Sequence, residues 1–239
     1  MLSRSRHSTP EAFSDLVTCF VINLDSRPER WQRAERNCRR RGISPIRFSA
    51  HDVEAGRRAF PTSPRSPAEL GLWSSFRTVV ESDVDTEWIL VLEDDALLLP
   101  RFRSQLLAEI RRADPSIVSV RVGWLGSFVW RHGMTVGWYV RSVPRHLLGR
   151  ARHALRGKLS DRYNFRPRRL WGTHALLIRR DGVELLLETL GEGMSALDDA
   201  FDDAEWSNPT RFKRSRRNLA WQAPGPSSIR VDLGSQDAR

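Results

Sequence analysis

The chain has 239 residues, 40% of them hydrophobic, and includes nine Trp and ten Phe. Its 39 Lys and Arg outnumber 29 Asp and Glu, which gives a formal net charge of +10. This length and this apolar content exclude an intrinsically disordered chain and fit one large domain with its own core.

Strand and helix patterns alternate through the first half of the chain. A polar arm, rich in Arg and Ser, covers 1–14, and the apolar run at 17–24 is typical of a strand covered on both faces. Further strands are predicted at 46–50, 88–92 and 117–122, and helices at 29–41, 67–82 and 100–113. The alternation favours an α/β fold, a single domain with a mostly parallel central sheet flanked by helices.

The second half is less regular. Residues 128–169 hold eleven Arg and Lys and the single acid Asp161, and we expect an insertion there. A strand is predicted at 174–178, and helices at 181–190 and 195–206. Residues 207–239 carry Pro, Gly, Ser and a basic cluster and are predicted to be an irregular tail, so the main domain is expected to cover 15–206.

Two features bear on the compartment. The apolar run from Leu16 to Leu24 is about half a membrane span and no small-residue cleavage site follows it, so we expect a cytoplasmic protein. Cys19 and Cys38 have no motif spacing and are expected to be buried or free thiols, which suits a reducing compartment.

Three consecutive acids, Glu93, Asp94 and Asp95, follow the strand at 88–92. In extended chain, Glu93 and Asp95 point one way and Asp94 the other. Adjacent carboxylates repel one another unless a positive charge lies among them, and a hard divalent cation accepts oxygen ligands. Because ligands of open α/β sheets bind beyond the carboxyl ends of strands, the triplet predicts a Mn²⁺ or Mg²⁺ site. The alternative is a solvated acidic turn ahead of Pro100.

Four stretches of the chain carry a further pattern, which spans 17 to about 203. They are Val21-Ile22-Asn23-Leu24 with Arg27-Pro28-Glu29-Arg30, Phe48-Ser49-Ala50-His51-Asp52, Glu69-Leu70-Gly71 through Ser75 with Leu92-Glu93-Asp94-Asp95, and Gly172-Thr173-His174-Ala175 with Asp198-Asp199. In order and spacing the chain resembles glycosyltransferase family 25, which includes lipooligosaccharide galactosyltransferases and collagen galactosyltransferase domains.

The resemblance implies a GT-A-like fold and an inverting transfer of a hexose, galactose or glucose, from a UDP-sugar donor. The acceptor would be a hydroxyl of a glycan, a lipid-linked glycan or a protein. On this interpretation Glu93 and Asp95 hold the cation and Asp94 reaches the sugar or ribose hydroxyls. The other donor-binding candidates are Asn23 and Arg30 at the nucleotide, Asp52 at the base or ribose, and Arg27 or Arg30 at the diphosphate. For both arginines, a surface charge at a helix start is the alternative.

An inverting transfer needs a general base, and the resemblance favours Asp198 or Asp199. The alternative is that both are first-turn acids of a helix capped by Ser195. Asp202 and Asp203 are expected on a solvated face. Gly172 and His174 are candidates for the acceptor side, with a buried, hydrogen-bonded histidine as the alternative to a sugar contact for His174.

Phe76 departs from the family pattern, which has a histidine at this place. A histidine that touches donor or acceptor would put activity in doubt here and suggest a degenerate member that binds sugar nucleotides without turnover. If the position only packs, Phe76 is an acceptable core substitute.

Residues 145–156 combine an apolar helical face with arginines on the remaining positions. Such a helix fits peripheral contact with an anionic membrane at its inner face, an anionic acceptor, or ordinary packing on the domain. An Arg-rich nucleic-acid-binding protein is a second hypothesis. The chain offers no recognised nucleic-acid motif and the acidic triplet repels phosphates, so we consider nucleic acid an unlikely partner.

Overall fold

The computed structural model describes residues 12–123, 172–191 and 193–223. The expected insertion at 128–169, with its helix at 145–156, lies outside the described residues, as do 1–11 and 224–239.

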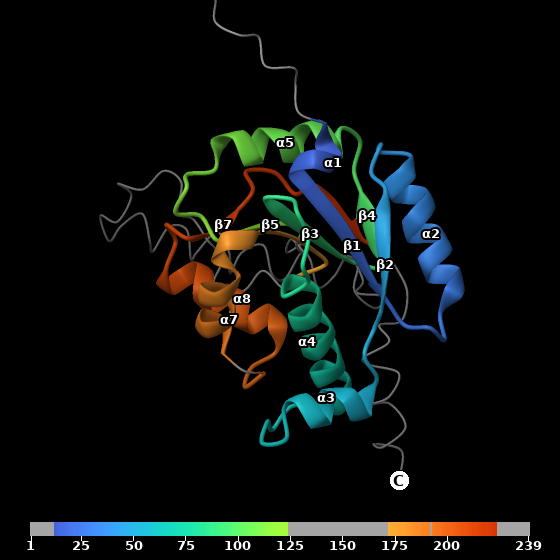
Figure 1. The fold of residues 1–239 in the computed structure, drawn as a ribbon, viewed down its shortest axis with the longest axis vertical. Coiled ribbons are helices and arrows are strands. Elements are labelled where there is room, and N and C mark those ends of the chain that lie inside the picture. The colour runs from blue at the N-terminus through green and yellow to red at the C-terminus, as the bar shows by residue number, and fades with distance from the viewer. Residues whose placement is uncertain (1–11, 124–171, 192, 224–239) are drawn as a thin grey trace, which may run out of the picture.

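One eight-stranded sheet organises the described chain (Figure 1). Its strands are β1 (Val17–Asn23), β2 (Pro45–Ser49), β3 (Trp88–Glu93), β4 (Ala96–Leu98), β5 (Ser119–Gly123), β6 (Ala175–Arg179), β7 (Phe212–Arg214) and β8 (Ala220–Gln222). They follow the order β2-β1-β3-β6-β5-β8-β4, with β7 also paired to β5. Only two residues separate β3 from β4 along the chain, although three other strands lie between them in the sheet. The sheet must therefore curl.

The expected α/β domain with a helix-flanked sheet is confirmed, and the sheet is mixed. β1 runs parallel to β2 and β3, and β5 runs parallel to β7 and β8. β6 is antiparallel to both β3 and β5, and β4 is antiparallel to β8. Parallel pairing thus occurs both in the N-terminal half, where strands and helices alternate, and between β5 and the two C-terminal strands.

Local signals mark the start of some of the helices. They are α1 (Phe13–Leu16), α2 (Pro28–Arg39), α3 (Val53–Ala59), α4 (Pro67–Val80), α5 (Phe102–Arg112), the 3₁₀ turn η1 (Arg180–Gly182), α7 (Val183–Leu190) and α8 (Leu197–Ser207). Pro28 opens α2, and Ser66 and Glu69 form the capping box of α4. No helix of the described residues is long and apolar enough to cross a membrane.

Side chains of the central strands point alternately to the two faces of the sheet and pack into two hydrophobic cores, one on each face. Val21, Leu90 and their neighbours pack under α2 and α5. Phe20, Val91 and their neighbours pack under α4, α7 and α8. The expectation for the cysteines is confirmed, because Cys19 and Cys38 are both free and buried.

Phe76 belongs to the second core. Its ring meets Trp73 and Phe201 edge-on, with centroids 6.3 and 5.8 Å away, and the side chain is fully buried. The position is therefore a packing position in this fold, and Phe76 gives no reason to expect a protein without turnover.

Two predicted boundaries were wrong. The arm was expected to extend to residue 14, but Phe13 is buried and starts α1. The tail was expected to be irregular from 207, but Phe212–Arg214 and Ala220–Gln222 join the sheet. Strands of three residues are too short for alternation to be visible in the sequence, and their pairing with β5 and β4 is what makes them strands.

Candidate active site

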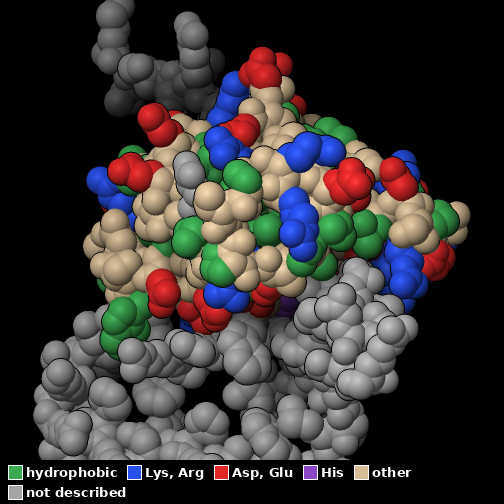
Figure 2. All heavy atoms as spheres, turned by 90° about the horizontal axis from the view of Figure 1, so that it is seen from below, with side chains coloured by type: hydrophobic (Ala, Val, Ile, Leu, Met, Phe, Trp, Pro, Cys, Tyr) green, Lys and Arg blue, Asp and Glu red, His purple; other side chains and the backbone are tan. Residues whose placement is uncertain are grey.

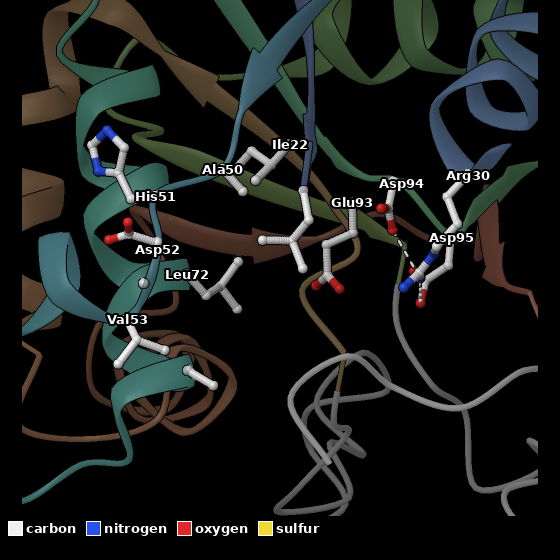
Figure 3. Close-up of a pocket in the computed structure, with 13 residues that line it drawn as sticks. Ile22, Arg30, Ala50, His51, Asp52, Val53, Leu72, Glu93, Asp94 and Asp95 are labelled. Carbon is white, nitrogen blue, oxygen red and sulfur yellow. Dashed lines mark hydrogen bonds and ion pairs between the residues drawn. The ribbon is translucent and has the colours of Figure 1, made fainter. Parts of the chain in front are cut away.

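A cavity of about 210 Å³ opens at the carboxyl ends of β1 and β3 (Figure 3). One end is charged and is formed by Arg30, Glu93, Asp94 and Asp95. The other walls are mostly apolar, and their side chains are those of Ile22, Leu24, Ala50, Val53, Ala68 and Leu72. His51, Asp52 and Gly71 complete the lining. A cavity that joins an acidic end to apolar walls suits a flat organic ligand whose anionic part brings a cation with it.

Strand register places the acids at this edge. β1 and β3 are parallel and Ile22 lies opposite Glu93, so the chain leaves both strands at the same end of the sheet. α2 follows β1 directly and brings Arg30 over the acids, as Figure 3 shows.

Arg30 bridges two of the three acids. Its Nη2 lies 2.7 Å from Asp94 Oδ1 and 2.9 Å from Asp95 Oδ2. The expected alternation of the triplet was wrong, because β3 ends at Glu93 and the next two residues form the turn to β4. Asp94 and Asp95 therefore both face the guanidinium, and Glu93 faces the cavity.

Asn23 holds Asp94 in place. Its Nδ2 donates to Asp94 Oδ2 at 2.8 Å and to the Arg27 carbonyl at 3.0 Å, while its Oδ1 accepts from Arg47 Nε at 3.0 Å. Asn23 is buried and does not line the cavity. It is thus a positioning residue for Asp94 here. Arg27 has an exposed side chain and meets this network through its carbonyl.

The wall opposite the acids is fixed by short contacts between 51–52 and α4. The His51 N–H donates to Ser75 Oγ at 2.8 Å, and His51 Nδ1 is 2.7 Å from Ser74 Oγ. A Cβ on Gly71 would stand 2.8 Å from the His51 carbonyl oxygen, so only glycine allows this approach. Asp52, which also lines the cavity, caps α3 by accepting the Ala55 N–H at 2.7 Å.

The charged end of the cavity carries more negative charge than Arg30 relieves. Burial raises the pKa of Glu93 well above its usual value, and the charges of Asp95, Asp198 and Asp94 raise it further, against the opposing effect of Arg30. Burial also raises the pKa of Asp94, against its hydrogen bond from Asn23 and the charge of Arg30. Asp95 Oδ2 accepts from Gln222 Nε2 at 3.0 Å, whereas its Oδ1 is buried and, among the described residues, has no hydrogen-bond partner.

Glu93→Gln is expected to make the cation-free protein more stable at neutral pH. The pKa of Glu93 is raised on folding, so its carboxylate destabilises the fold increasingly as pH rises from its unfolded pKa towards its folded pKa. The stability gain of Glu93→Gln should therefore shrink as pH falls into the acid range. Urea unfolding across that pH range measures it. Glu54→Gln, on the exposed face of α3, is the control, and a pH-independent difference for Glu93→Gln would contradict the interpretation.

The two predicted bases lie at the start of α8. Asp198 Oδ1 accepts a hydrogen bond from Thr173 Oγ1 at 2.8 Å. The charge of Asp198 is one of those that raise the pKa of Glu93. Asp199 is half-buried beside it. The expectation for Asp203 is confirmed, since it is exposed, but that for Asp202 was wrong, since it is buried and pairs with Arg121 at 2.9 Å.

The two acceptor-side candidates do not line the cavity. Gly172 has φ = 108°, a conformation that favours glycine. His174 is buried, and its Nε2 donates to the Ala220 carbonyl at 2.9 Å. Burial lowers the pKa of His174, so the neutral form is favoured. Its environment corresponds to the buried, hydrogen-bonded alternative and not to a sugar contact.

Three side chains of the site were missed by the sequence analysis. Arg47 on β2 orients Asn23, Thr173 orients Asp198, and Gln222 on β8 holds Asp95. Thr173 belongs to the Gly172-Thr173-His174-Ala175 stretch, and its position just before a predicted strand could have indicated a role at the site. Gln222 has no such signal, because its strand lay in the supposed irregular tail.

The described acids only partly meet the needs of a divalent cation. No group of three or more His, Cys, Asp and Glu within the described ranges is arranged to hold a metal ion. Arg30 takes one oxygen each of Asp94 and Asp95. The unpartnered Asp95 Oδ1 and the Glu93 carboxylate are hard oxygen ligands, and a diphosphate in the cavity would supply more. These residues therefore fit a cation that arrives with an anionic ligand.

No protein-family model matches the chain, and no curated protein matches it. Among solved structures, a glycosyltransferase involved in glycosylation of the major capsid of PBCV-1 is 10% identical, with a TM-score of 0.43 over 92% of this chain and 98% of that one. A mutant Drosophila beta-1,4-galactosyltransferase 7 with manganese, UDP-Gal and xylobiose is 12% identical, with a TM-score of 0.45 over 94% and 75%. Mycobacterium tuberculosis glucosyl-3-phosphoglycerate synthase with Mn²⁺, UDP and phosphoglyceric acid is 14% identical, with a TM-score of 0.42 over 96% and 80%. Likeness this distant decides neither substrate nor mechanism, and membership of family 25 stays a prediction.

Proposed function

We propose that the protein is a GT-A-like glycosyltransferase that moves a hexose, galactose or glucose, from a UDP-sugar to a hydroxyl group with inversion. The observation that carries the proposal is the cavity at the ends of β1 and β3, with acids at one end and apolar walls at the other. A nucleoside fits the apolar part beside Asp52, and the diphosphate then lies at the charged end. The surplus negative charge of the acids would then be offset by a divalent cation that accompanies the diphosphate.

Glu93 and Asp95 are the residues that would hold a Mn²⁺ or Mg²⁺ ion. When bound, the cation neutralises the charge that develops on the departing UDP. Asn23 fixes Asp94 at the edge of the cavity, where a sugar or ribose hydroxyl would donate to it. Arg27, exposed at the start of α2, is a second cationic group for the phosphates.

Asp198 is the favoured general base. Thr173 holds one of its oxygens, and Oδ2 accepts no hydrogen bond from any residue that the structure describes. That oxygen is free to accept the proton of an attacking hydroxyl. The half-buried Asp199 is the alternative base.

The distribution of charge bears on the acceptor. Eleven of the 39 basic residues but only one of the 29 acidic residues lie between 124 and 171, which leaves 28 of each elsewhere. On the described part of the face seen in Figure 2, acidic and basic side chains are interspersed. The net charge of +10 thus belongs to the segment with the predicted helix at 145–156. We propose a glycan or lipid-linked glycan acceptor that is anionic, and a cytoplasmic protein that meets the inner face of the membrane there.

UDP and Mn²⁺ together are expected to raise the melting temperature by about 5–10 °C at saturating concentrations. Asp95→Ala should abolish this shift, and Asp95→Asn should do the same with less disturbance of the Arg30 contact. Differential scanning fluorimetry with UDP, GDP and ADP measures the shift and its nucleotide preference. Asp85→Asn, in the exposed turn that precedes β3, is the control and should keep the shift. If no nucleoside diphosphate stabilises the protein, the proposed function is wrong.

A further inference from the structure

Arg30 occupies the place from which a cation would act on the acids. Its guanidinium bridges Asp94 and Asp95 at 2.7 and 2.9 Å, and the three side chains are only 13%, 11% and 10% exposed. Charge-assisted contacts of this length in a sheltered site are among the stronger polar interactions of a protein. A divalent cation at Asp95 would sit beside this guanidinium, and two positive charges at that distance repel each other.

Some carboxylate oxygens of the same site are not bound by Arg30. Asp95 Oδ1 is buried with no hydrogen-bond partner in the part of the chain that the structure describes, and Glu93 faces the cavity. The Arg30 guanidinium already bridges Asp94 and Asp95, so it cannot also pair with Asp95 Oδ1 and the Glu93 carboxylate. Arg30 also lines the cavity, so its head group can turn towards a ligand without crossing the core.

We propose that Arg30 is an exchangeable counter-ion, an inference that rests on the proposed function of this site. Without ligand, Arg30 neutralises Asp94 and Asp95 and keeps divalent cations weakly bound. When a nucleoside diphosphate binds together with its cation, Asp95 and Glu93 would supply oxygen ligands to that cation, and Arg30 would turn to the diphosphate oxygens. Cation and nucleotide then strengthen each other's binding, and the coupling is reciprocal.

The exchange is tested by the affinity for Mn²⁺ alone. Arg30→Gln is expected to raise this affinity at least tenfold, because no guanidinium competes for Asp95, and to lower the affinity for UDP in the presence of Mn²⁺. Electron paramagnetic resonance of free Mn²⁺, with and without UDP, gives both values. Arg30→Met repeats the experiment without a side-chain amide, and circular dichroism confirms that each variant is folded.

Arg33→Gln is the matched control. Arg33 lies on the same helix and lowers the pKa of Asp94 through its charge alone, with no ion pair to the triplet. It should change the Mn²⁺ affinity less than about threefold, since only a long-range charge is lost. An equal gain in both variants would overturn the exchange and leave a general charge effect.

The failure of this inference differs from failure of the proposed function. If Arg30→Gln and Arg30→Met bind Mn²⁺ no better than the unchanged protein, the exchange is wrong, whatever UDP does. If both gain Mn²⁺ affinity but UDP never stabilises the protein, the counter-ion role stands at the cation site and the diphosphate part of the exchange is wrong together with the UDP donor.

Discussion

Replacement of Arg121 by methionine is expected to lower the free energy of unfolding by about 3–5 kcal/mol. Arg121 lies on β5, fully buried, with Nη1 2.9 Å from Asp202 Oδ1 and Nε 2.9 Å from Glu205 Oε1. Arg214 pairs with the same two acids. Two arginines thus balance two buried carboxylates, and the variant leaves one negative charge without compensation.

The loss should depend on pH. Burial raises the pKa of Asp202, and the charges of Arg121 and Arg214 oppose that rise. Without Arg121 the pKa of Asp202 rises further, so the folded variant takes up a proton more readily and its deficit shrinks as pH falls. Urea unfolding at neutral and mildly acidic pH measures both effects. Arg214→Met, with the more exposed of the two arginines, should cost less, and a loss below about 1 kcal/mol for Arg121→Met would refute the estimate.

This network matters to the site because it anchors α8. Asp202 and Glu205 tie the helix to β5 and β7, and the guanidinium of Arg121 also lies over the Phe201 ring at 5.8 Å. Asp198 stands one turn earlier on the same helix. A shift of α8 would therefore displace Asp198 as well.

Short sequence patterns predicted those strands and helices whose formation depends on neighbouring residues. The apolar run of β1 and the capping box of α4 were readable, because burial on both faces and helix capping leave marks within a few residues. The antiparallel direction of β6 could not be predicted, because a short strand of four apolar residues and Arg179 does not record the direction in which the chain returns. α3 was also missed, since its Asp52 cap precedes only seven helical residues in what looked like a loop.

In the candidate site, too, some features could be predicted from local sequence and others depend on contacts between distant segments. The position of the acids at the end of β3 followed from the sequence, since the edge of a sheet is set by strand direction. Their pairing did not follow. It depends on α2 returning over the turn at 94–95 and on Gln222 arriving from a strand more than a hundred residues away. Contacts between distant segments leave no periodicity in either segment.

Asp198→Asn is expected to lower the rate of sugar transfer by about 10²–10⁴-fold. The substitution keeps the shape of the side chain and an oxygen for the Thr173 hydroxyl, 2.8 Å away, but removes the capacity to take a proton. Water replaces the acceptor when no sugar acceptor is added, so UDP release from UDP-galactose or UDP-glucose reports the same step. The melting-temperature shift with UDP and Mn²⁺ should persist, because Asp198 is not part of the cavity lining.

Asp199→Asn separates the two candidate bases. Both residues lie in the first turn of α8 and are half-buried, so the charge removed from the helix start is the same. Asp198 is oriented by the Thr173 hydroxyl and its charge raises the pKa of Glu93, and Asp199→Asn should therefore keep the rate within about fivefold. If Asp199→Asn causes the larger loss, the proton goes to Asp199 and the Thr173 contact is only a helix-start hydrogen bond. If neither variant loses rate while UDP and Mn²⁺ still bind, the base lies outside α8.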